Sequence, residues 1–288
     1  MSDSPIGFIG LGNMGAPMAA NLAAAGWPLI VHDAAGTRER APAGAITAAS
    51  LAEVSAQAPV VLLSLPDSAA VDAVSDAILA APSNITARVI DTSTIGIAAA
   101  RRVHEKLAAA GIEYVDAPVS GGVAGARAGS VSIMVAGPAE SFEALRPMLE
   151  SFTGNAFHVG VEPGQGQAMK VLNNFLSGTA MAATSEAVAF GASQGLGLAT
   201  MLDVLNVSTG RNTATSDKFV NRILTETYDA GFSCEQMNKD LSLYREGLAQ
   251  SGAADPVSGA VAEIWQRFHQ ASPNSDISRI YPFIKTND

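Results

Sequence analysis

Residues 6–22 read IGFIGLGNMGAPMAANL, a short apolar run followed by a Gly-x-Gly-x-x-Gly sequence and then by apolar residues at helical spacing. We therefore expect a strand, a tight turn and a helix, in that order. This arrangement suits a dinucleotide pyrophosphate, because Gly10 can make the turn, Gly12 lets backbone approach the phosphates and Gly15 lets the helix pack close to the strand. The residues predicted to bind the cofactor in this loop are Gly10, Leu11, Gly12, Asn13, Met14 and Gly15.

An acidic residue, Asp33, follows the second apolar run and lies 18 residues beyond Gly15. That separation is close to the one at which a carboxylate meets the adenosine ribose of a dinucleotide. A carboxylate accepts hydrogen bonds from both ribose hydroxyls and repels a 2′-phosphate. The nearest arginines, Arg38 and Arg40, are several residues further on. The sequence therefore favours NAD over NADP, with Asp33 as the residue that sets the choice.

The composition narrows the class of protein. A chain of 288 residues with 48% hydrophobic content can bury the cores of two domains. The net charge of −10 and the lack of a basic cluster argue against a nucleic-acid surface. A single cysteine and four scattered histidines predict no disulfide and no metal site. The first apolar run begins too early for a signal peptide and no run is long enough to span a membrane, so we expect a soluble cytoplasmic protein with no membrane partner.

The N-terminal part alternates short apolar runs with alanine-rich helical stretches. The runs are rich in Val, Ile and Leu without polar alternation, which is typical of strands covered on both faces. The expected strands are 6–9, 29–32, 60–64, 89–91, 114–116, 132–135 and 157–159, and the helices between them include 69–79, 98–109 and 139–151. The pattern predicts an α/β domain of Rossmann type, with a doubly wound and mostly parallel sheet, over residues 1–163.

After residue 163 the pattern becomes helical. A proline-free stretch of about 28 residues runs to Gln194, and at 1.5 Å per residue it would form roughly 40 Å of helix, enough to join two domains. Further helices are expected near 198–208, 214–224, 237–250 and 256–270, with a loop at 272–278 and no strand. The sequence therefore predicts an all-α second domain over residues 164–288, joined to the first by a long interdomain helix.

Four motifs together resemble the β-hydroxyacid dehydrogenase family, which includes 3-hydroxyisobutyrate, tartronate semialdehyde and threonate dehydrogenases. They are the glycine loop, the segment DAPVSGG at 116–122, the segment GQGQAMKVLNN at 164–174 and the segment KDL at 239–241. They occur in the family's order and at about its spacing, and they cover nearly the whole chain. The resemblance implies a fold like that of 6-phosphogluconate dehydrogenase and the transfer of a hydride between NAD and a small β-hydroxy acid or its semialdehyde.

Lys170 is the predicted catalytic residue. It follows a glycine-rich breaker at the start of the long helix, and Asn174 lies one turn further on the same face. Burial would lower the pKa of a lysine from about 10.4 toward the range of an acid–base catalyst. A solvated helix lysine is the alternative from the residues alone. The resemblance implies that Lys170 exchanges a proton with the substrate oxygen and that Asn174 hydrogen-bonds the substrate.

The segment Ser120-Gly121-Gly122 is the candidate site for the acid group of the substrate. A hydroxyl followed by two residues without side chains can present backbone N–H groups to a carboxylate. From the residues alone a plain glycine turn explains the segment equally well. The resemblance implies that Ser120, Gly121 and Gly122 hold the substrate carboxylate.

The resemblance also assigns residues at three other places. Leu65 and Pro66, after the third expected strand, would border the cofactor, and Thr94, after the fourth, would lie near its nicotinamide side. Both segments end strands, where open α/β sheets bind ligands. Lys239 would reach the cofactor, and Asp240 would line or support the substrate site. We expect this charged pair to open a helix, where a solvated first turn is the ordinary interpretation.

Three alternative functions share this fold. An imine reductase or a non-catalytic nucleotide-sensing protein would be expected to lack the lysine that Lys170 supplies. A decarboxylating enzyme of the 6-phosphogluconate type would need a much larger helical domain. The identity of the β-hydroxy acid is left open by the sequence.

The long helix also predicts a homodimer or homotetramer. Its apolar residues are spread around much of its circumference, and they include Leu172, Phe175, Leu176, Met181, Val188 and Phe190. Such a helix needs cover on several sides, while the helices after it are few and short, so a second copy of this domain would supply the cover. The alternative is that the C-terminal helices surround the long helix within one chain.

Overall fold

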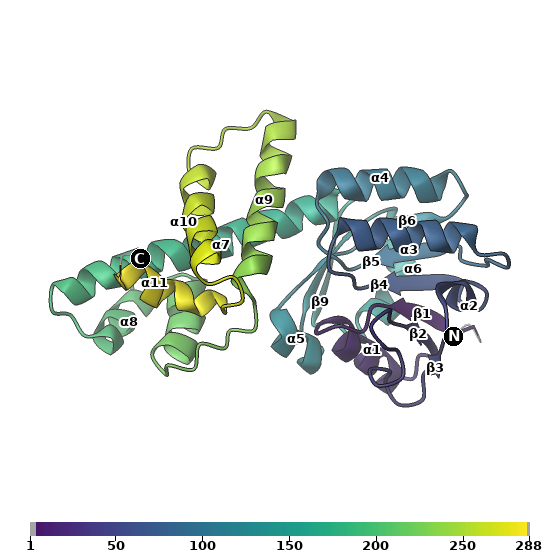
Figure 1. Cartoon of the computed structure of the whole chain (residues 1–288), viewed down its shortest axis with the longest axis horizontal. Helices are drawn as coiled ribbons and strands as arrows, with labels where there is room; N and C mark the ends of the chain where they lie inside the picture. The colour runs from purple at the N-terminus through teal and green to yellow at the C-terminus, as the bar shows by residue number, and fades with distance from the viewer. Residues whose placement is uncertain (1–3, 287–288) are drawn as a thin grey trace. The chain divides into compact units, whose positions relative to one another are not determined.

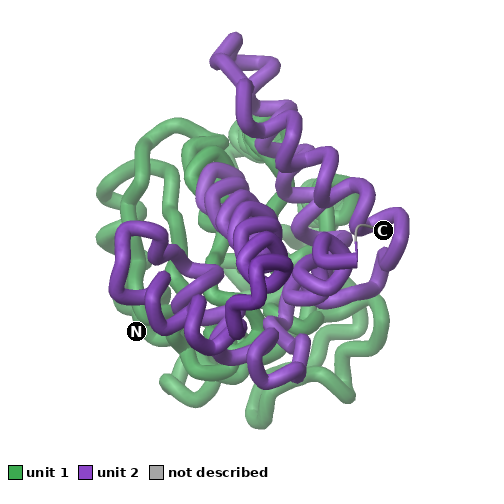
Figure 2. Tube along the Cα trace, turned by 90° about the vertical axis from the view of Figure 1, so that its left-hand side faces the viewer, with its two compact units in different colours: residues 1–170 green, residues 171–288 purple. Residues whose placement is uncertain are grey.

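The computed structural model describes residues 4–286 and divides into two compact units, residues 1–170 and 171–288 (Figure 2). The strands of the first unit are β1 (Ile6–Ile9), β2 (Leu29–His32), β3 (Ile46–Thr47), β4 (Val60–Leu63), β5 (Arg88–Asp91), β6 (Glu113–Asp116), β7 (Val119–Ser120), β8 (Ser132–Ala136) and β9 (Asn155–Gly160). Its helices are α1 (Gly15–Ala24), α2 (Leu51–Ser55), α3 (Ser68–Ala80), α4 (Ile97–Ala108), α5 (Gly122–Ala128) and α6 (Ala139–Leu149).

The strands form one sheet in the order β3-β2-β1-β4-β5-β6-β8-β7, with β9 paired to β8. All pairs from β3 to β6 are parallel. Phe8 and Ile9 of β1 are both buried but belong to separate apolar clusters, so both faces of the sheet are covered. The helices α3 and α4 lie side by side on one of these faces (Figure 1). The predicted doubly wound, mostly parallel sheet is confirmed.

The sheet has two short strands that the sequence did not predict, and each has a local reason. Both residues of β3 are exposed, so no apolar run marks that strand. The strand β7 continues β6: the pairs Asp116↔Ala136 and Val119↔Ile133 share one antiparallel register with β8. Pro118 interrupts the strand but still accepts a hydrogen bond from Met134 N through its carbonyl oxygen. The chain after β6 is thereby carried past the carboxyl edge of the parallel strands.

The second unit is helical, as predicted. Its elements are α7 (Gln165–Ser193), which begins in the first unit, then α8 (Leu198–Asn206), the π-helix η1 (Ala214–Ile223), α9 (Cys234–Ser251), α10 (Ser258–Ala271), the short 3₁₀ helix η2 (Ile277–Arg279) and α11 (Ile280–Thr286). Trp265 and Phe219 are fully buried in its core. The Trp265 indole donates to the carbonyl of Gly178 at 3.1 Å. No helix within residues 4–286 is both long enough and apolar enough to cross a membrane.

Three sequence predictions in this unit need correction. The helix expected from residue 237 begins at Cys234, because Ser233 and Gln236 form a reciprocal capping box. Lys239 and Asp240 therefore lie in its second turn and do not open it. The segment 214–224 is helical as expected but is wound as a π-helix, as the bond from Leu224 N to Phe219 O shows. The loop expected at 272–278 ends in the 3₁₀ turn η2.

Candidate active site

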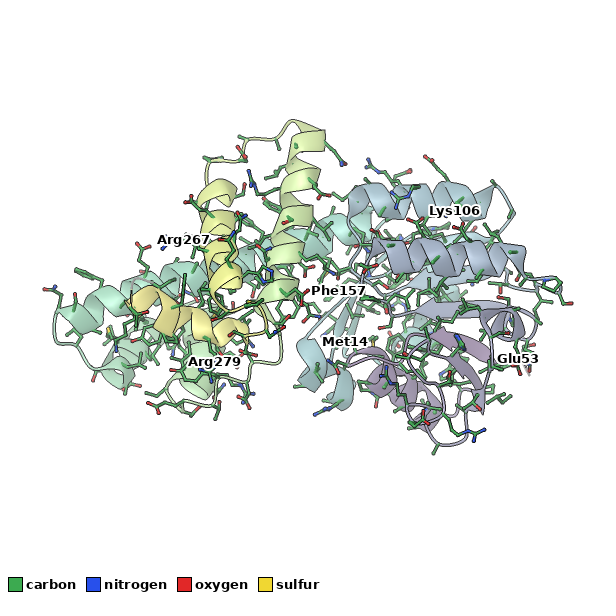
Figure 3. All side chains as sticks on the ribbon, viewed as in Figure 1. Met14, Glu53, Lys106, Phe157, Arg267 and Arg279 are labelled. Atoms are coloured by element: carbon green, nitrogen blue, oxygen red, sulfur yellow. The ribbon has the colours of Figure 1, made fainter. Side chains whose placement is uncertain are left out.

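The glycine loop between β1 and α1 leaves open space where a cofactor would need it. A Cβ on Gly10 would collide with the carbonyl of Ser64, and one on Gly15 would collide with the carbonyl of Gly10. A Cβ on Gly12, by contrast, would meet no atom within 4 Å. Met14, labelled in Figure 3, stands at the start of α1 and makes no side-chain capping bond. The N–H groups of the first turn are thus not capped by Met14, and the loop fits a dinucleotide phosphate.

Asp33 is tied to the glycine loop. Its Oδ2 accepts a hydrogen bond from Leu11 N at 2.6 Å, and its Oδ1 accepts from Ala35 N at 2.8 Å. Arg40 Nη1 lies 3.2 Å from the same Oδ1 in an ion pair, and 10% of the Asp33 side chain is exposed. The carboxylate that the sequence assigned to the ribose therefore stands beside the loop assigned to the phosphates.

The predicted residues after β4 and β5 are joined through Ser93. Leu65 N donates to Ser93 Oγ at 2.8 Å, and Ser93 N donates to Asp91 Oδ1 at 2.9 Å. Because β1, β4 and β5 are neighbouring parallel strands, Leu65, Pro66 and Thr94 lie at the same edge of the sheet as the glycine loop. This is the edge at which open α/β sheets bind nucleotides.

The segment predicted to hold the substrate carboxylate lies at the end of β7. Ser120 pairs with Ser132 of β8, Gly121 is exposed and Gly122 begins α5. These residues follow the continuation of β6 past the edge of the parallel strands. Their proposed role in holding the substrate stays a prediction.

Helix α7 begins against the carboxyl end of β6 and the middle of β8. A Cβ on Gly166 would lie 2.8 Å from the carbonyl oxygens of Asp116 and Met134, so only glycine permits this approach. Gly164 N and Gln167 N donate to Asp116 Oδ2 at 3.1 and 3.0 Å, and this carboxylate therefore caps the helix from a distant strand. Lys170, in the second turn, is 7% exposed.

Gln167 is fully buried and uses its whole side-chain amide. Its Nε2 donates to Asp116 Oδ1 at 2.7 Å and to the carbonyl of Ser93 at 3.0 Å. Its Oε1 accepts from Ile95 N at 2.9 Å and from Gly96 N at 3.1 Å. No role was predicted for Gln167 or Asp116 from the sequence, where they occur only as members of the segments 164–174 and 116–122. Buried polar side chains that contact distant backbone leave no periodic signal in a sequence.

Two buried carboxyl groups lie side by side at the ends of β5 and β6, where Asp91 and Asp116 are register partners. Burial raises the pKa of Asp116 to about 7, against the lowering effect of its hydrogen bonds from Gln167 and Gly164. Burial likewise raises the pKa of Asp91 to about 6, while bonds from Ser93 and Tyr114 oppose the rise. Tyr114 Oη donates to Asp91 at 3.0 Å. Both acids therefore change protonation near neutral pH.

In the second unit, three of the predicted residues form a polar group. Asn174 Nδ2 donates to Asp240 Oδ2 at 2.5 Å, and Lys239 Nζ lies 3.6 Å from Asp240 Oδ1. Asn174 and Asp240 are both buried. Asp240 thus orients the Asn174 amide. That Asp240 lines or supports the substrate site, as the resemblance implies, stays a prediction. The contact of Lys239 with the cofactor stays a prediction.

Comparison with known proteins identifies the family. Residues 5–160 match the model of the NAD-binding domain of 6-phosphogluconate dehydrogenase, and residues 164–284 match the model named for the NAD-binding of NADP-dependent 3-hydroxyisobutyrate dehydrogenase. The chain is 38% identical to 3-hydroxyisobutyrate dehydrogenase of Pseudomonas aeruginosa, with 96% of this chain and 98% of the relative covered. It is 37% identical to the NAD-dependent L-serine dehydrogenase of the same organism, with 91% of each covered.

A solved structure agrees with these matches. The structure of Mycobacterium tuberculosis 3-hydroxyisobutyrate dehydrogenase with L-serine superposes with a TM-score of 0.89 at 35% identity, covering 98% of this chain and 99% of the other. Sequence, fold and the glycine loop with its acidic partner therefore point to one family. The chain belongs to the β-hydroxyacid dehydrogenases, the NAD-dependent oxidoreductases related to 3-hydroxyisobutyrate dehydrogenase.

Proposed function

We propose that this enzyme oxidises a small β-hydroxy acid to its semialdehyde with NAD, and that Lys170 is the acid–base catalyst. One observation carries the proposal: Lys170 is buried in the second turn of a helix whose start is hydrogen-bonded to Asp116 at the carboxyl end of β6. A lysine with a flexible stem and a proton to exchange is suited to that position.

The substrate class follows from what the relatives named above act on. 3-Hydroxyisobutyrate and L-serine both carry a hydroxymethyl group on the carbon that bears the carboxylate. We infer that this chain accepts an acid with the same arrangement, a hydroxymethyl group on the carbon that bears the carboxylate. Ser120, Gly121 and Gly122 are the proposed groups that bind the carboxylate. Asn174, oriented by Asp240, is the proposed partner of a substrate oxygen.

The chemistry requires one proton and one hydride to leave the alcohol. The neutral amine of Lys170 takes the proton from the substrate hydroxyl while the C–O bond becomes a carbonyl. The chemistry that bound NAD would supply is an acceptor for the hydride that leaves the same carbon. In the reverse direction the ammonium of Lys170 returns the proton to the carbonyl oxygen. Asp33 supports NAD over NADP as the cofactor, because its carboxylate would repel a 2′-phosphate.

The test is the appearance of NADH with a panel of acids that includes 3-hydroxyisobutyrate, L-serine and threonate, each with NAD and with NADP. Turnover of at least one acid with NAD, lost in Lys170→Ala, supports the proposal. The matched control is Lys106→Ala, since Lys106 (Figure 3) makes ion pairs with Asp72 and Asp76 on the surface of the first unit and its loss should leave turnover unchanged. Reduction of cyclic imines without oxidation of any hydroxy acid would favour an imine reductase. Binding of NAD without any turnover would favour a nucleotide-sensing protein.

A further inference from the structure

We propose that Gln167, acting through Asp116 and the backbone of residues 93–96, is a positioning residue that fixes Lys170 for proton transfer. We call these groups the Gln167 clamp. The inference rests on the proposed function, because it assigns to Lys170 the proton that Gln167 helps to place. Gln167 itself does not touch the reacting atoms in this scheme.

The clamp is complete in its hydrogen bonding. A glutamine amide has two N–H donors and an oxygen with two lone pairs, and all four are used here: two bonds donated to Asp116 and Ser93, and two accepted from Ile95 and Gly96. The partners also fix which way the amide faces, since Ser93 offers a carbonyl and Ile95 and Gly96 offer N–H groups. A fully buried side chain held at four points is fixed in one orientation.

The clamp joins the two parts of the first unit that the reaction has to align. Lys170 lies three residues, or about one helical turn, after Gln167, so a rotation or shift of that turn moves the amine directly. Ile95 and Gly96 directly follow Thr94, the residue assigned to the nicotinamide side of the cofactor. Gln167 therefore connects the backbone beside the expected site of hydride transfer to the turn that carries the proton-transfer group.

Helix capping alone does not account for the arrangement. Asp116 already caps α7 by accepting from Gly164 N and Gln167 N. The three side-chain contacts of Gln167 to residues 93–96 add nothing to that cap, and they reach across 71 to 74 residues of sequence. These contacts fix the position of the first turn of α7 relative to the segment that follows β5, whereas a helix cap only satisfies the N–H groups of the helix start. Reacting groups displaced by about 1 Å can lose on the order of 10²-fold in rate.

The experiment compares Gln167→Ala and Gln167→Glu with a matched control, Gln165→Ala, in the full-length enzyme. Gln165 is two positions earlier on the same helix and is exposed, and its side-chain oxygen accepts a hydrogen bond from Glu162 N at 2.9 Å. Both Gln167 variants should lower kcat by about 10- to 100-fold, while the Kd of NAD measured by calorimetry changes by less than a few-fold. The control should keep kcat within about two-fold, since it leaves every contact of the clamp in place.

Two further measurements separate positioning from a loss of folding. First, Asp116→Asn combined with Gln167→Glu lets an amide at 116 donate to a carboxylate at 167, so the double variant should regain part of the kcat that Gln167→Glu loses. Second, Gln167→Ala added to Lys170→Ala should lower the remaining turnover by less than about two-fold, because no amine is left to position. Both measurements are read alongside thermal unfolding of each variant.

The outcomes distinguish this inference from the proposed function. An inactive Lys170→Ala together with wild-type kcat in Gln167→Ala overturns the clamp and leaves the role of Lys170 standing. A full additional loss when Gln167→Ala is added to Lys170→Ala also overturns it, because Gln167 then acts independently of the lysine. Activity retained in Lys170→Ala overturns the proposed function itself, and the positioning role fails with it.

Discussion

Asp116 and Gln167 are 51 residues apart in the chain, yet two hydrogen bonds join them, one from the backbone N–H of Gln167 and one from its side-chain amide. The carboxylate at the end of β6 thereby holds the first turn of α7, the helix that carries Lys170. The placement of the proposed catalytic amine depends on a contact between strand and helix that no local sequence pattern specifies.

We predict that Lys170→Ala lowers turnover by about 10²–10⁴-fold while the affinity for NAD stays within a few-fold, because general acid–base catalysis contributes rate and not cofactor binding. Lys170→Arg should be nearly as inactive, since a guanidinium keeps its proton. Single-turnover kinetics with the acid that the wild type prefers, together with NAD titration, provide the measurement. A variant that keeps more than a tenth of wild-type turnover, with chemistry rate-limiting, would exclude Lys170.

Cofactor choice should respond to Asp33. Replacing Asp33 by Asn together with Ala34→Arg removes the repulsive carboxylate, releases Arg40 from its ion pair and adds a second partner for a 2′-phosphate. We expect the ratio of kcat/KM for NADP to that for NAD to rise at least about tenfold, which corresponds to about 1.4 kcal/mol. A wild-type enzyme that already prefers NADP would contradict our assignment of Asp33.

The buried pair Asp91 and Asp116 predicts how stability depends on pH. Their pKa values rise from the ordinary 3.8 to about 6 and about 7 on folding, so the folded protein binds more protons than the unfolded chain between these limits. The favourable contribution of these two protonated acids to the free energy of unfolding is complete below pH about 4. It is lost as the pH rises through their folded-state pKa values of about 6 and about 7. Each acid can add a slope of up to about 1.4 kcal/mol per pH unit.

Urea denaturation at several pH values across that window measures this slope. Asp116→Asn removes one of the two titrations, so its free energy of unfolding should vary less with pH than that of the wild type. An equal slope in wild type and variant would show that Asp116 titrates alike in the folded and unfolded chain.

Self-association is predicted from the second unit. Leu176 and Phe190 of α7 are 60% and 67% exposed in the single chain, and Val207 after α8 is 87% exposed. Covering these side chains with a second copy would remove apolar surface from water. We expect light scattering at micromolar concentration to give a mass two or four times 29.4 kDa. A mass that stays at the single-chain value at every concentration would contradict the prediction.

Paired variants test which surface is used. Leu176→Ser combined with Phe190→Ser should lower the mass toward that of one chain, since both side chains would lose apolar area at the contact. Ile85→Ser is the matched control, because Ile85 is 50% exposed but lies in the first unit. Dissociation by the control and not by the paired variant would place the interface elsewhere.

The sequence predicted well the features that have a local pattern. The apolar runs predict the central strands β1, β2, β4, β5 and β6, and the helical stretch expected up to Gln194 ends within one residue of the last residue of α7, Ser193. Asp33 was found from its distance to the glycine loop and stands beside that loop in the structure. These features depend on periodicity and spacing, which a sequence carries directly.

The features that the sequence did not predict depend on contacts distant in the chain. The strand β7 exists because β8 pairs with it, and no run of apolar residues announces it. Gln167 reads as an ordinary helix residue until its partners at 93–96 and 116 are in place. The start of α9 differs, because it does have a local signal: Ser233 and Gln236 form a capping box that begins the helix at Cys234, three residues before residue 237.

The continuity of the glycine loop with Asp33 has a consequence for synthesis. All groups assigned to the adenosine half of the cofactor lie within residues 10–33, whereas Lys170 and its anchoring partners extend from residue 93 to residue 170. Domains are made and folded from the N-terminus, at roughly 5–20 residues per second. A growing chain therefore holds its nucleotide-recognition residues many seconds before Lys170, the amine assigned to proton transfer, has been translated.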